Sequence, residues 1–138
     1  MRVVLDTNVL ISALLLSAST SAQIVVAWRR GAFDLLTCDL QLQEVRAVTR
    51  RASVRALIRP ALAGELVNQL RAVALQIDPL PSVDRSIDSF DNFLLAMAQG
   101  GQADVLVSGD KLGVLALKAH GNCRIVTVRE FANGLKVN

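Results

Sequence analysis

Short apolar runs that stop at polar residues are the feature that most constrains the fold of this chain. Arg2–Leu5 stops at Asp6-Thr7-Asn8, and Asp104–Val107 stops at Ser108-Gly109-Asp110. Such runs are typical of buried parallel strands, and the polar residues that follow them are typical of helix N-termini. Because strands of this kind alternate with helical segments along the chain, we expect an α/β fold with a mainly parallel sheet between helical layers.

The other expected elements follow the same alternation. Helices are predicted over about 9–16, 22–30, 39–51, 61–75, 91–98, 112–118 and 127–134, and strands over 33–37, 77–80 and 124–128. In the helix over 61–75, Leu62, Leu66, Leu70 and Val73 share one side. With 138 residues, the chain suits a single domain over 1–138.

Composition excludes several classes of protein. Hydrophobic residues make up 52% and charged residues 20% of the chain, so global disorder is excluded. Two cysteines and one histidine cannot form a disulfide scaffold, a four-ligand zinc site or a His-rich cluster. The charge-free stretch over 7–28 could resemble a signal peptide, but its cleavage would remove the first strand. We therefore expect a cytoplasmic protein with reduced thiols and no membrane partner.

Acidic residues fall where a parallel sheet is expected to bind ligands, at the carboxyl ends of its strands. Asp6 ends the first strand, Asp110 follows the strand near 105–107, and Asp91 opens a helix that enters the same layer. Each of the three also suits a helix cap, which is worth about 1 kcal/mol. Glu44, inside the helix over 39–51, suits a solvated surface position equally well.

A run of arginines lies between Val45 and Gly64, a stretch that contains no acid. Arg46 and Arg50 come first, and Arg51, Arg55 and Arg59 then recur every four residues. If this stretch is one helix, the last three share a face that could follow a phosphate backbone. A solvated helix face explains the same spacing. The net charge of +3 permits a nucleic-acid partner without requiring one.

Three segments resemble motifs of the PIN-domain nucleases. Residues 4–12 read VLDTNVLIS and are similar to the opening motif, while 88–96 read DSFDNFLLA and 103–111 read ADVLVSGDK, similar to the third and fourth motifs. Glu44 lies where the family places its second acid. The resemblance covers essentially the whole chain and is closest to VapC-like toxins of toxin–antitoxin pairs. It implies a PIN-like three-layer α/β/α sandwich with a short, mainly parallel central sheet.

The resemblance also implies an activity, that of a metal-dependent endoribonuclease. One or two Mg²⁺ or Mn²⁺ ions would lie on Asp6, Asp91 and Asp110, with Glu44 orienting or deprotonating the attacking water. Crowded carboxylates favour a divalent cation, and hard ions prefer oxygen ligands. The residues expected to hold these carboxylates in place are Thr7, Asn8, Asp88, Asn92 and Ser108. The RNA contacts are assigned to Arg46, Arg50, Arg51 and Arg55, and the implied partners are RNA, a cognate antitoxin and a second copy of the chain.

Two other functions stay open at the level of sequence. Relatives often carry a further acid after the Gly-Asp-Lys run, where this chain has Leu112-Gly113. A catalytically inactive PIN-fold binding or assembly module would explain that difference. Asp6-Thr7-Asn8 also resembles the first motif of haloacid-dehalogenase-type phosphatases, but those enzymes need an aspartate where Asn8 stands.

Overall fold

The computed structural model describes residues 1–85, 91–109 and 113–136. Its centre is a six-stranded sheet in the order β3-β2-β1-β4-β6-β5. The strands are β1 (Arg2–Leu5), β2 (Asp34–Thr37), β3 (Leu75–Gln76), β4 (Val105–Val107), β5 (Ala119–His120) and β6 (Cys123–Val126). Every neighbouring pair is parallel except β5 and β6, which form an antiparallel hairpin. The expected α/β fold with a mainly parallel sheet is confirmed.

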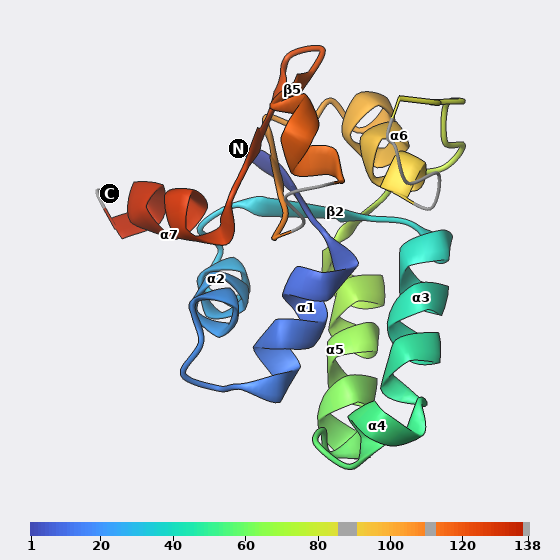
Figure 1. Cartoon of the computed structure of the whole chain (residues 1–138), viewed down its shortest axis with the longest axis vertical. Coiled ribbons are helices and arrows are strands. Elements are labelled where there is room, and N and C mark those ends of the chain that lie inside the picture. Colours follow the sequence, from blue (N-terminus) through green and yellow to red (C-terminus); the bar gives the residue numbers. More distant parts are fainter. Residues whose placement is uncertain (86–90, 110–112, 137–138) are drawn as a thin grey trace.

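Helices cover both faces of the sheet. They are α1 (Thr7–Leu15), α2 (Thr20–Arg29), α3 (Asp39–Thr49), α4 (Ala52–Arg55), α5 (Pro60–Val73), α6 (Asn92–Gly100) and α7 (Val128–Lys136), with a 3₁₀ helix η2 (Val114–Leu117). Figure 1 shows α1, α2, α3 and α5 on one side of the sheet and α6 on the other. This is the three-layer arrangement that the sequence predicted.

The two faces of the sheet alternate along each strand, as the pleat requires. In β1, Val3 and Leu5 face the layer of α1, α2, α3 and α5, whereas Val4 faces α6. Leu106 of β4 packs with Val4, and its neighbours Val105 and Val107 pack in the other cluster. Because both faces are buried, Val3–Leu5 of β1 and all of β4 are apolar, which is why they appear in the sequence as unbroken runs.

The direction of α6 determines which edge of the sheet its first residue approaches. Arg2 begins β1, and its Nη1 donates a hydrogen bond of 2.8 Å to the carbonyl of Gly101, just beyond the end of α6. The last turn of α6 therefore lies at the amino ends of the strands. Since α6 packs against β1, β2 and β4, its first turn points to the carboxyl ends, and Asp91 precedes that turn.

Local details differ from the sequence prediction in several places. The strand expected over 77–80 is instead β3 (Leu75–Gln76), which lies where the sequence predicted the end of the helix over 61–75. The segment expected as a helix over 112–118 is only the 3₁₀ helix η2 where it is described, and the two-residue strand β5 was not predicted.

In α5, Leu66 and Leu70 are buried as predicted. Leu62 and Val73 are exposed instead, and Ala63 and Val67 complete the buried face.

No single helix in the described part of the chain is long and apolar enough to cross a membrane. Only α1 and α2 together reach the necessary length and composition, and they meet at an angle of 101°.

Candidate active site

Asp6 lies at the carboxyl end of β1 and is 5% exposed. It is the N-cap of α1, and its Oδ1 accepts a hydrogen bond of 3.2 Å from the backbone N–H of Asn8. The helix cap that the sequence offered as the simple explanation is therefore present. Its other oxygen, Oδ2, accepts a hydrogen bond of 2.8 Å from the hydroxyl of Ser108. A cap needs only the first contact, so the second indicates that the carboxylate is held in one orientation.

The register of the sheet explains why Ser108 reaches Asp6. Leu5 of β1 pairs with Val107 of β4, and the backbone N–H of Asp6 donates to the carbonyl of Val107 over 2.9 Å. The residue after each strand therefore lies beside its counterpart. Ser108 is fully buried, and its assignment as a residue that positions Asp6 agrees with this contact. For Asn8 the contact comes from the backbone, because its side chain is exposed.

Gln41 and Thr37 also belong to this edge, and the sequence did not single them out. The hydroxyl of Thr37, the last residue of β2, donates to Oε1 of Gln41 over 2.8 Å. The Nε2 of Gln41 donates to the carbonyl of Leu5 over 2.7 Å. Both side chains are buried. Gln41 thus ties α3 to the ends of β1 and β2, next to Asp6.

Glu44 is one turn further along α3 than Gln41, at a spacing of three residues that shares a helix face. Its side chain is half-buried. Burial raises the pKa of the Cys38 thiol, and the charges of Asp39 and Glu44 add to this increase. The thiol stays protonated at neutral pH, so Cys38 is a poor metal ligand or nucleophile.

Asp91 and Asn92 mark the start of α6 at the same edge. Asp91 is the N-cap of α6 without a side-chain capping bond, and its Oδ2 is buried. The side chain of Asn92 accepts a hydrogen bond of 3.1 Å from the backbone N–H of Arg85. Asn92 therefore holds the loop that precedes residues 86–90. Whether it also orients a carboxylate is not tested by the described contacts.

The donor atoms at this edge suit a hard divalent cation. Asp6, Asp91 and Glu44 supply carboxylate oxygens, the type of ligand that Mg²⁺ and Mn²⁺ prefer. Thr7 is fully buried, and its hydroxyl has no hydrogen-bond partner among the described residues. A buried hydroxyl of this kind is unusual. It adjoins Asp6 in the chain and would be satisfied by a water of a hydrated ion. The donor types present therefore suit such an ion.

Two predicted site residues, Asp110 and Asp88, lie outside the described residues. Within the described residues, Asp6, Glu44 and Asp91 do not form a group of three close enough to hold a metal ion by themselves. The four-carboxylate site thus stays a prediction.

The arginine stretch is not the single helix that its spacing suggested. Arg51 is the N-cap of the one-turn helix α4, and Arg59 is the N-cap of α5. The chain turns between them, so Arg51, Arg55 and Arg59 do not form one helical stripe. Instead, Arg46, Arg50 and Arg55 line a common hollow of about 600 Å³ between α3, α4 and α5.

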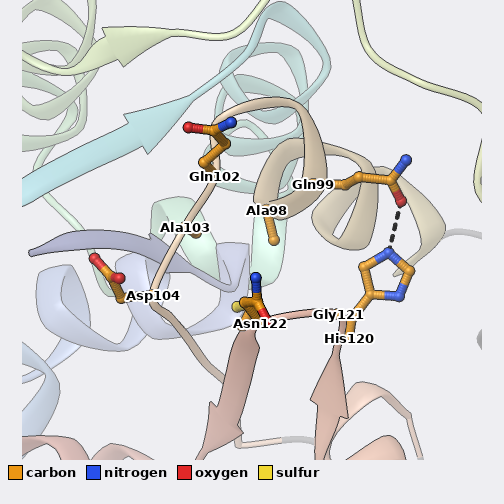
Figure 2. Close-up of a pocket in the computed structure, with 9 residues that line it drawn as sticks. Ala98, Gln99, Gln102, Ala103, Asp104, His120, Gly121 and Asn122 are labelled. Atoms are coloured by element: carbon orange, nitrogen blue, oxygen red, sulfur yellow. Dashed lines mark hydrogen bonds between the residues drawn. The ribbon is translucent and has the colours of Figure 1, made fainter.

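Another hollow of about 600 Å³ lies at the opposite edge of the sheet, where β4 and β6 begin (Figure 2). Three of the polar side chains that line it form hydrogen bonds. His120 pairs with Oε1 of Gln99 over 2.8 Å and with Nη1 of Arg85 over 2.7 Å. Asp104 accepts a hydrogen bond of 2.8 Å from the backbone N–H of Arg2. None of the predicted catalytic residues lines this hollow. The structural role expected for His120 agrees with these contacts.

The fold and its acidic carboxyl edge define a parallel α/β domain of the kind that binds ligands where its strands end. The sequence matches the PIN domain family over residues 2–112, and the chain belongs to that family. PIN domains are typically nucleases, which supports a hydrolase acting on phosphodiester bonds. No curated protein matches the chain.

Proposed function

We propose that this PIN domain is a metal-dependent endoribonuclease and the toxin of a toxin–antitoxin pair. The observation that carries the proposal is the burial of polar groups at one edge of the sheet. Of the six buried polar or charged residues in the described part of the chain, five belong to this edge: Asp6, Thr7, Thr37, Gln41 and Ser108. Burying polar groups is costly unless they are hydrogen-bonded. At this edge the hydrogen bonds fix the Asp6 carboxylate in place.

The contacts of Asp6 support its proposed role, and the roles of Asp91, Asp110 and Glu44 come from the resemblance to the PIN-domain nucleases. Asp6 and Asp91, with Asp110, would hold the ion, while Ser108 and the N–H of Asn8 fix the orientation of the Asp6 carboxylate. Each carboxylate oxygen can accept two contacts, so the bond from Ser108 is compatible with a cation. When bound, Mg²⁺ or Mn²⁺ lowers the pKa of a water and stabilises charge on the phosphate. Glu44 takes the proton from the attacking water.

The decisive experiment compares RNA cleavage by the wild type, Asp6→Asn and Asp91→Asn, using metal-stripped protein, added Mn²⁺ or Mg²⁺, and tRNA and rRNA substrates. Loss of an outer partner of a metal ligand costs about 10–100-fold, so loss of a ligand costs at least about 100-fold. Asp104→Asn is the matched control, because it removes the same charge at the opposite edge. If Asp6→Asn cleaves as well as the wild type, the assignment is wrong.

A non-catalytic binding module is the second candidate, favoured by Leu112-Gly113 in place of a further acid. Millimolar Mn²⁺ should raise the melting temperature of the wild type and not of Asp6→Asn if the ion site exists. Cleavage absent from all substrates, together with no such shift, would favour the module.

The toxin role has its own test. Induced expression of the wild type should stop bacterial growth, and expression of Asp6→Asn should not. If growth continues although the purified protein cleaves RNA, the toxin assignment is wrong and only the nuclease assignment stands. The cognate antitoxin and the homodimer are part of the same proposal, and light scattering of the purified protein reports the second.

A further inference from the structure

A hollow at the far end of α3 gathers arginines from two helices. Arg46 and Arg50 come from the C-terminal end of α3, and Arg55 comes from α4. The opposite wall is the first half of α5, where Pro60, Gly64 and Asn68 line the hollow. Its volume of about 600 Å³ is large enough for a phosphate group together with its sugar. We call this the arginine hollow.

Among the described residues, no acid lines the arginine hollow. Its lining contains no Asp or Glu, and within the described residues Arg46, Arg50 and Arg55 form no ion pair. Glu65 lies next to Gly64 in the sequence, but it lines the hollows on the other sides of α5. Three guanidinium groups around one hollow repel each other, and an anion between them would relieve that repulsion.

The hydrogen-bond donors in the arginine hollow suit phosphate. Guanidinium groups bind phosphate oxygens through two parallel N–H bonds. The exposed amide of Asn68 makes no hydrogen bond to the described residues and adds a neutral donor. The hydroxyl of Thr49, by contrast, is already bonded to the carbonyl of Val45 over 2.8 Å.

The arginine hollow and the acidic edge lie at opposite ends of α3. Figure 1 shows α3 running from the end of β2 to α4. Glu44, the proposed proton acceptor, lies six residues before Arg50 in this helix, so the two are about 9 Å apart along its axis at a rise of about 1.5 Å per residue. One strand of a double helix places a phosphate about every 3.4 Å along its axis, so this separation spans a few nucleotides.

From this geometry we propose that the arginine hollow binds a backbone phosphate of the RNA substrate, a few nucleotides away from the bond that is cut. This inference rests on the proposed function, because it takes RNA as the ligand. It narrows the arginine assignment made from the sequence. Arg46, Arg50 and Arg55 contact the phosphate, whereas Arg51 and Arg59, which do not line the hollow, contribute only general charge.

The test measures RNA binding rather than cleavage, so its failure can be told apart from failure of the nuclease assignment. Each arginine is replaced in an Asp6→Asn background, without added divalent metal, and the affinity for a fluorescent single-stranded RNA of mixed sequence is measured against salt concentration. Each phosphate contact that is lost reduces the slope of log K against log [salt] by about 0.7. We expect this reduction for Arg50→Ala and Arg55→Ala.

Matched controls make the outcome specific. Arg51→Ala and Arg59→Ala remove the same charge from the same stretch and should leave the slope unchanged. Arg50→Lys keeps the charge and should retain most of the slope. Equal losses at all four alanine positions, an unchanged slope at Arg50 and Arg55, or no RNA binding by the parent protein would each overturn the proposal. If RNA binding follows the expected pattern but the wild type cleaves no RNA, the arginine hollow stands as a phosphate-binding site and the nuclease assignment is wrong.

Discussion

Polar side chains are buried at one edge of the sheet and exposed at the other. At the carboxyl edge, Asp6, Gln41 and Ser108 are buried and tied to strand ends. At the amino edge, Asp104 is exposed, and His120 and Gln99 bind each other beside an open hollow (Figure 2). The hollow at the amino edge therefore lies away from the proposed catalytic residues. Burial of polar groups, which costs free energy unless they are hydrogen-bonded, distinguishes the two edges and is the reason to propose the site at the carboxyl edge.

The largest expected effect on stability comes from Gln41. In Gln41→Ala the hydroxyl of Thr37 and the carbonyl of Leu5 both lose a buried partner, and a cavity remains. We expect a loss of about 3 kcal/mol in the free energy of unfolding, measured by urea denaturation. Gln43→Ala, at an exposed position of the same helix, is the control and should change stability little. Similar losses of stability in both variants would show that the buried hydrogen bonds of Gln41 are not the cause of the loss.

Ser108 tests the proposed metal site more directly than Gln41, because its hydroxyl donates a hydrogen bond to the Asp6 carboxylate, whereas Gln41 donates to the backbone. Ser108→Ala should cost about 1 kcal/mol of stability and should weaken Mn²⁺ binding by about 10–100-fold. Isothermal titration calorimetry of wild type and variant measures the second effect. Ser12→Ala, on the exposed side of α1, should change neither quantity. If Ser108→Ala keeps full metal affinity, the Ser108 hydroxyl only stabilises the fold.

A substitution at the amino edge should lower stability without changing the rate of RNA cleavage. Asp104→Ala removes the acceptor for the backbone N–H of Arg2 and should cost about 1 kcal/mol of stability. Its rate of RNA cleavage should equal that of the wild type when both are folded. A fall in kcat without a fall in stability would mean that the amino edge takes part in the reaction, and the contrast between the edges would fail.

Part of the candidate site could be proposed from the sequence for a physical reason. Asp6 stands where an apolar strand gives way to a helix, and Asp91 opens a helix after a polar stretch, so both residues are conspicuous in the sequence. Gln41 could not be found, because a glutamine inside an amphipathic helix is normally solvent-facing. Its burial depends on the end of β1 lying beside α3, which is a tertiary contact.

Dependence on tertiary contacts also explains why the arrangement of the arginines was predicted wrongly. A spacing of four predicts a shared face only if the helix continues, and the turn before Pro60 ends it. The arginine hollow is formed by α3 and α5 lying side by side, which no local pattern contains. The strand β5 was missed because two residues carry no periodicity.

The smallest expected effect concerns His120. Burial lowers the pKa of His120 below its usual value, and the nearby charge of Arg85 lowers it further. The folded state therefore binds its proton less readily than the unfolded state, so the stabilising contribution is present above the unfolded pKa and is lost as the pH falls below it. The melting temperature should fall between pH 7.5 and pH 5 by more in the wild type than in His120→Gln, which keeps a neutral side chain. Because the Arg85 contact lies at the amino edge, the two proteins should bind Mn²⁺ equally at pH 7.5. Equal melting-temperature changes would mean that the pairing of His120 with Arg85 does not depend on the protonation of the imidazole.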